Sequence, residues 1–295
     1  MKLFTHCFTL FIALTTVFLG NVSFTQEKDT TTSLLWEITG RKVKNPSYLF
    51  GTIHLISRDK FYFPESLQDK VKNSERLVME IGGLSDQMQM ASLLFLKEGD
   101  LFDHFTHEQT DSIINYMEQN LSYDSTQVRT MFGRMKPMAL MQLFTKNAFG
   151  ENPASYEMSL EKIAKEYELE IEGLESIEEQ MAIFDNMTME DQVEMVMSGI
   201  RSSEDSQLLM EQLQESYLSQ DIDAIYKFME SDSSSMMNYE DDLLHDRNER
   251  WIPLIKKHVK KKRCFIAVGA AHLGGERGVI NLLREEGYTV TPVKF

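Results

Sequence analysis

The sequence predicts an α/β fold in which one central sheet is built from two β-α-β halves, with a large helical insertion between them. Two stretches of the sequence, in which the same elements follow one another in the same order, support this prediction. Residues 48–81 and residues 265–293 each contain a strand, a Gly-x-x-His motif, a loop, a helix and a second strand. Between them, residues 85–245 contain few glycines or prolines, and apolar side chains recur every three or four positions, as in amphipathic helices.

The N-terminal segment has the pattern of a secretory signal peptide. Lys2 precedes an apolar stretch that ends near Gly20, and small and polar residues follow, so we expect residues 1–25 to be removed near Gln26. An uncleaved anchor is the alternative, because about 18 apolar residues are close to the lower limit for spanning a bilayer. The polar residues 26–33 are expected to form a tether. The protein is therefore expected to be exported, and to be periplasmic, secreted or surface-associated.

The rest of the chain, residues 34–295, is predicted to be a single domain. Apolar runs bounded by glycine and proline predict strands at residues 34–38, 47–50, 77–81, 264–268 and 288–293. Helices are expected at residues 64–73, 242–262 and 275–286. The helical insertion, residues 85–245, contains one exception, a short predicted strand at residues 169–174.

The chain of 295 residues carries a formal net charge of −16. A surface this acidic repels phosphate backbones and anionic lipids, so we expect neither nucleic-acid binding nor peripheral membrane binding. Contact with a membrane is expected only through the N-terminal segment, if that segment is not cleaved.

Each Gly-x-x-His motif follows an apolar strand. Gly51-Thr52-Ile53-His54 ends the strand at residues 47–50, and Gly269-Ala270-Ala271-His272 ends the strand at residues 264–268. Ligands of open α/β sheets bind beyond the carboxyl ends of the strands, where glycine lets the chain turn sharply. One such motif is weak evidence, whereas two in matching positions predict that His54 and His272 converge. His104 and His107 are weaker candidates, because the intervening Thr106 and the later Gln109 form a capping-box pattern.

Glu80 lies inside the apolar strand at residues 77–81, so its carboxylate needs a charged or hydrogen-bonding partner. Two histidines and a glutamate are a common ligand set for a divalent metal such as Zn, Mn, Fe or Co. A metal there would polarise a carbonyl group and activate water, which is hydrolytic chemistry. The alternative is that both histidines are core residues and Glu80 belongs to a structural ion pair.

The sequence resembles the TraB/GumN family, which is related to the Tiki proteins. The resemblance extends over roughly residues 34–293 and rests on the two histidine motifs, the strand that holds Glu80, and several shorter pieces. These pieces are Lys136-Pro137, Gly173-Leu174-Glu175-Ser176, Glu179-Gln180, and Arg247-Asn248 with Trp251. Gly274 departs from the family pattern, in which proline is frequent, and this difference should only loosen the loop.

This resemblance implies an erythromycin-esterase/ChaN-like fold and metal-dependent protease activity. The family's proposed active-site histidines and glutamate correspond to His54, His272 and Glu80. Glu175 and Arg247 match further motif positions and are additional catalytic candidates.

The leading hypothesis is an exported metal-dependent hydrolase, a Tiki-like peptidase acting on a peptide or protein. His54, His272 and Glu80 would bind the metal, or Glu80 would be the general base, and Arg247 would stabilise the developing oxyanion. The helical insertion would cover the site. A non-catalytic protein that binds haem, a metal or a peptide in the same cleft is the second hypothesis, and a purely structural protein is the third.

Overall fold

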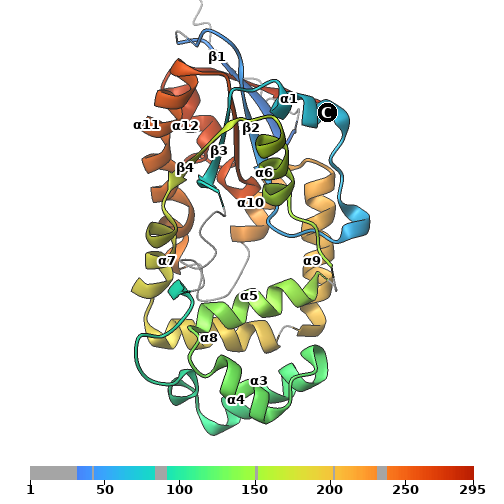
Figure 1. Ribbon diagram of the computed structural model, residues 1–295, viewed down its shortest axis with the longest axis vertical. Coiled ribbons are helices and arrows are strands. Elements are labelled where there is room, and N and C mark those ends of the chain that lie inside the picture. Colours follow the sequence, from blue (N-terminus) through green and yellow to red (C-terminus); the bar gives the residue numbers. More distant parts are fainter. Residues whose placement is uncertain (1–31, 42, 84–91, 150–151, 202, 231–237) are drawn as a thin grey trace, which may run out of the picture. The chain divides into compact units, whose positions relative to one another are not determined.

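The computed structural model describes residues 32–295 except residues 42, 84–91, 150–151, 202 and 231–237 (Figure 1). The predicted signal peptide and most of the predicted tether lie outside the described residues, so both stay predictions. None of the helices in the described part of the chain combines the length and the apolar character that a membrane crossing requires.

A six-stranded mixed sheet forms the centre of the domain and confirms the predicted α/β class. Its order is β4-β3-β5-β2-β1-β6. Strands β4, β3, β5 and β2 run parallel, whereas β1 is antiparallel to both β2 and β6. The strands are β1 Leu35–Thr39, β2 Ser47–Thr52, β3 Arg76–Ile81, β4 Glu170–Glu175, β5 Cys264–Gly269 and β6 Thr289–Val293.

The two β-α-β units interleave within this sheet. The first unit runs from β2 through α1 (Glu65–Lys72) to β3, and the second runs from β5 through α12 (Val279–Glu285) to β6. Strand β5 lies between β2 and β3, so the second unit begins inside the first. As a result, the strands that precede the two histidine motifs are direct neighbours, and Gly51 pairs with Val268.

Helices cover both faces of the sheet, which explains why its central strands are mainly apolar. All residues of β5 from Cys264 to Val268 are buried. Helix α6 (Tyr156–Glu166) contacts α1, β3 and β4. Helix α11 (Asp246–Lys261) contacts α12 and β4, and Figure 1 shows α11 and α12 across the sheet from α1 and α6. Helix α11 begins later than expected, because residues 241–245 form a π-helical turn before it.

The region between β3 and α11 is mainly helical, as predicted, and part of it has a hydrophobic core of its own. Ile113, Met117, Leu140 and Val196 are among the residues buried in this second core. The predicted strand in this region is β4, which forms one edge of the sheet. The remaining helices are α3 His107–Leu121, α4 Ser125–Phe132, α5 Pro137–Ala148, α7 Ile177–Asn186, α8 Met189–Arg201, α9 Ser203–Leu218 and α10 Ile222–Glu230.

Gly51 gives a test of how closely the first histidine motif packs. A Cβ atom on Gly51 would lie 2.7 Å from Leu273 Cδ1 and 3.0 Å from Ala270 Cα, so the loop after β5 leaves no room for a side chain. We expect Gly51→Ala to lower the free energy of unfolding by about 1–3 kcal/mol, as overpacking does in cores. Urea denaturation measures this change, and a loss below about 0.5 kcal/mol would contradict the close contact.

Candidate functional site

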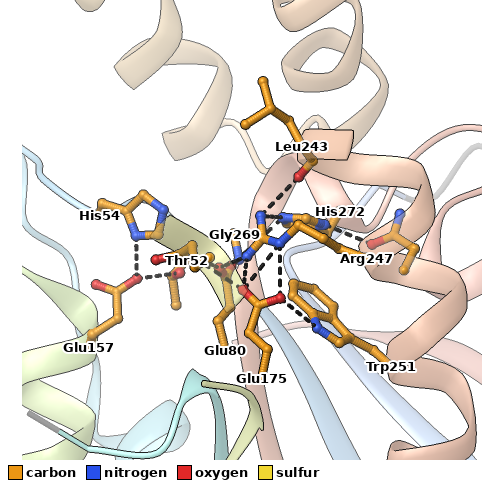
Figure 2. A network of polar contacts seen from close by, with 12 residues as sticks. Thr52, His54, Glu80, Glu157, Glu175, Leu243, Arg247, Trp251, Gly269 and His272 are labelled. Atoms are coloured by element: carbon orange, nitrogen blue, oxygen red, sulfur yellow. Dashed lines mark hydrogen bonds and ion pairs between the residues drawn. The ribbon is translucent and has the colours of Figure 1, made fainter. Parts of the chain in front are cut away.

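Polar side chains gather at the carboxyl ends of the four parallel strands (Figure 2). Glu80 is near the end of β3, Glu175 ends β4, and Gly269 ends β5. His54 follows β2, and His272 lies in the 3₁₀ turn Ala270–His272 directly after β5. The topology therefore brings residues from both ends of the chain to one edge of the sheet, where α/β proteins place their ligands.

Arg247, in the first turn of α11, is held between two buried carboxylates. Its Nη2 atom lies 2.6 Å from Glu80 Oε2 and 2.5 Å from Glu175 Oε1, and its Nε donates to Glu175 at 3.1 Å. The guanidinium also lies over the ring of Trp251, 4.7 Å from the ring centroid. The side chains of Glu80, Glu175 and Arg247 are each less than one-tenth exposed, so each charge depends on the others for compensation.

Glu80 has both of its carboxylate oxygens occupied. Oε1 accepts a hydrogen bond from the backbone N–H of Gly269 at 2.7 Å, and Oε2 accepts from Arg247 and from Gln180. Burial opposes ionisation of this carboxyl group, but the positive charges of Arg247 and His54 and the Gly269 N–H outweigh burial and hold its pKa below the usual value of 4.5. Glu80 is therefore ionised at neutral pH.

His272 is buried and neutral. The Asn248 amide donates to the Arg277 carbonyl, so its Oδ1 faces His272 Nδ1 at 2.7 Å and accepts a hydrogen bond from it. The Nε2 atom then carries the lone pair, and it accepts a hydrogen bond from Arg247 Nη1 at 3.1 Å. Burial is the main reason that the pKa of His272 falls from 6.5 to about 3.

His54 has the opposite environment. Its side chain is 72 % exposed, and its Nδ1 lies 3.0 Å from Glu157 Oε1. The hydrogen bond to Glu157 raises the pKa of His54 from 6.5 to about 9, so His54 is protonated at neutral pH. Glu157 is fixed in turn, because Thr52 donates to its Oε1 at 2.7 Å and Ser155 donates to its Oε2 at 2.9 Å.

Gly269 lies where the two motifs meet. A Cβ atom on Gly269 would be 3.3 Å from Glu80 Oε1, 3.5 Å from His272 Cδ2 and 4.0 Å from His54 Nε2. Both histidines bind an acceptor through Nδ1, as metal-ligating histidines commonly do. The donor chemistry beside Gly269 therefore fits a divalent cation.

The contacts of Arg247 oppose such a cation as the side chains stand. Within the described residues, no three His, Cys, Asp or Glu side chains are placed to bind a metal together. In addition, Arg247 binds Glu80 Oε2 and His272 Nε2. Binding of a metal by His54, His272 and Glu80 Oε1 would require Arg247 to release His272 Nε2.

The structure brings Glu80, Glu175, Arg247 and His272 into one hydrogen-bonded network, with His54 across Gly269 from His272 (Figure 2). Glu80 has a charged partner, Arg247, as expected for a carboxylate inside an apolar strand. His104 and His107 lie apart from this network, on either side of the Thr106 cap of α3.

Sequence reasoning missed Glu157, the partner of His54. One signal could have identified it. Glu157 precedes Leu160 by three positions and Ala164 by seven, so it belongs to the apolar face of α6, where a carboxylate needs a partner.

The first prediction concerns Arg247. Replacing it in Arg247→Ala leaves Glu80 and Glu175 buried without a counter-ion, so we expect the free energy of unfolding to fall by roughly 3–5 kcal/mol. The matched control is Arg277→Ala, which removes an arginine that pairs with exposed carboxylates and should lower the free energy of unfolding far less. Urea denaturation compares the two, and equal losses would contradict the role of Arg247 as the central counter-ion.

A second prediction concerns His54. NMR titration of the metal-free protein should give a His54 pKa near 9 and, in Glu157→Gln, a value close to 6.5, whereas His272 should not titrate above about pH 4. Because the folded-state pKa of His54 is raised, the ion pair stabilises the fold fully below about pH 6.5, and this stabilisation disappears as the pH rises through about 9. The loss should be small, because water screens so exposed a pair. An unchanged His54 pKa in Glu157→Gln would contradict this assignment.

Comparison with known proteins identifies a family for the chain. No curated protein and no solved structure matches the chain significantly. The profile of the TraB/PrgY/gumN family matches residues 34–292, a span that begins just before β1, ends within β6 and includes both histidine motifs. The chain therefore belongs to the TraB/PrgY/gumN family.

Proposed function

We propose that the protein is an exported, metal-dependent hydrolase that cleaves peptides at the edge of the sheet around Gly269. The observation that carries this proposal is the arrangement of His54 Nε2, the His272 ring and Glu80 Oε1 around the position of a Gly269 Cβ. Export follows from the predicted signal peptide, and peptide cleavage from the resemblance to the Tiki proteins.

His54, His272 and Glu80 would hold a divalent cation. When bound, the cation would lower the pKa of a water molecule and polarise the carbonyl group of the substrate. Its affinity should rise with pH up to about 9, because the proton on His54 competes with it.

Several side chains of this chain would prepare the site. Glu157 and Asn248 accept hydrogen bonds from the Nδ1 atoms of the two histidines, which leaves the Nε2 atoms to bind the cation once Arg247 releases His272 Nε2. Arg247 keeps Glu80 ionised, and once it releases Glu80 its N–H groups can donate to a negatively charged oxygen of the reacting group. The hydrogen bonds from Arg247 to Glu175 would remain, so the guanidinium would stay at the site.

Non-catalytic ligand binding is the second candidate, and one observation favours it. Arg247 already satisfies Glu80 and His272 Nε2, so the network is complete without a metal. In this case the cleft would retain a ligand that is never turned over.

The metal proposal predicts that the purified protein binds one Zn²⁺ or Mn²⁺ per chain in calorimetric titrations at pH 8. The variant His54→Ala/His272→Ala should bind none, whereas the control His104→Ala/His107→Ala, which removes two histidines outside the site, should bind normally. Gly269→Ala should stay folded and bind at least about tenfold more weakly, because its methyl group fills the space between the donors.

Failure of the unsubstituted protein to bind metal would overturn the metal-dependent mechanism. Mass spectrometry of a peptide library tests turnover. Retention of metal without any cleavage would favour the binding candidate instead.

A further inference from the structure

A groove with a volume of about 590 Å³ lies beside the first histidine motif. Its walls come from the segment after His54, from the end of α5 and from the start of α6. No aspartate or glutamate lines it among the described residues, although the whole chain has 46 acidic and 30 basic residues. We call this surface the cationic groove, after the side chains of Arg58, Lys146 and Lys162 that line it together with Leu55, Pro153 and Met158.

The wall that carries Arg58 is fixed by backbone hydrogen bonds. Ile56 donates to the Ala154 carbonyl at 3.0 Å, and Ala154 donates back at 2.8 Å, so the two loops of this wall form a short antiparallel bridge. Arg58 spans the same loops, because its Nη2 donates to Asn152 Oδ1 at 3.2 Å and to the Pro153 carbonyl at 3.5 Å. Its guanidinium is therefore positioned by neutral acceptors.

The positive charges of the groove are not neutralised by the described part of the chain. Arg58, Lys146 and Lys162 make no ion pair with any described carboxylate, and all three side chains are exposed. On a chain with a net charge of −16, three such cations around one groove form a local site for an anion. The apolar side chains of Leu55, Pro153 and Met158 lie in the same groove, so the ligand needs an apolar portion beside its negative group.

Ser155 links the cationic groove to the candidate active site. This residue lines the groove, and its Oγ donates to Glu157 Oε2, while the other oxygen of Glu157 binds His54 Nδ1. Leu55, which also lines the groove, directly follows His54 in the chain. A ligand in the groove would therefore extend toward His54.

We infer that the cationic groove binds a carboxylate of a peptide, supplied by an acidic side chain or by the C-terminus, and presents the adjoining segment to His54. This inference rests on the proposed function for cleavage, but peptide binding in the groove can be measured without it. A peptide fits the groove better than a small anion does, because cationic and apolar side chains line the same walls.

The test uses three dansyl-labelled heptapeptides of alanine and leucine. The first has a central glutamate and an amidated C-terminus, the second has glutamine in place of glutamate, and the third has glutamine and a free C-terminal carboxylate. Fluorescence anisotropy at 20 mM NaCl measures binding to the full chain, and mass spectrometry of the same samples measures cleavage. We expect a carboxylate peptide to bind about tenfold more tightly than the neutral one, because several exposed ion pairs each contribute modestly. The third peptide shows whether the C-terminus is the source.

Lys146→Gln/Lys162→Gln should reduce this preference to less than about threefold, whereas Arg58→Lys, which keeps the charge, should retain most of it. The control Lys260→Gln/Lys261→Gln removes two exposed lysines at the end of α11 and should leave the preference unchanged. Equal binding of all three peptides, or an equal loss in the control, would overturn the inference. Preferential binding without cleavage would support peptide binding in the groove and count against the proposed hydrolysis. Cleavage without preferential binding would support the hydrolysis and count against the groove.

Discussion

The ion pairs of Arg247 with Glu80 and Glu175 are the constraint on which the rest of the site depends. Two carboxylates at the ends of β3 and β4 are buried, and a single guanidinium from α11 pairs with both. Transfer of such charges from water costs several kcal/mol each, so the fold tolerates them only when every partner is in place. The same guanidinium donates to His272 Nε2, and therefore the positions of β3, β4, α11 and the loop after β5 are set together.

Two copies of one sequence motif give two histidines with opposite acid–base behaviour. His272 follows the central strand β5 and is enclosed by Trp251, Asn248 and Arg247, so burial keeps it neutral. His54 follows β2 and is mostly exposed, and the Glu157 carboxylate keeps it protonated. The motif fixes the turn after the strand, whereas the surroundings contributed by α6 and α11 fix the charge of each imidazole.

Much of the fold could be predicted from the sequence, because strand and helix periodicities are local properties. The six strands, the helical insertion and the family resemblance all follow from such patterns. The interleaving of the two units could not be predicted, since it depends on β5 pairing with strands from the opposite end of the chain. In the candidate site, the need of Glu80 for a charged partner was predictable from burial alone. The identity of that partner as Arg247, and the role of Glu157, arise from tertiary contacts that local patterns do not record.

The position of β5 has a consequence for folding. The strand pairs on one side with β2 and on the other with β3, and it is synthesised after both of them and after β4. A nascent chain that ends before residue 264 therefore lacks the strand that joins the two sides of its sheet, and β2 and β3 expose unpaired backbone edges that are prone to aggregation. Long-range parallel pairing of this kind also forms slowly, because the entropic cost of closing a large loop comes before any favourable contact between the strands. The sheet can be completed only after residues 264–293, which form β5 and β6, have been synthesised.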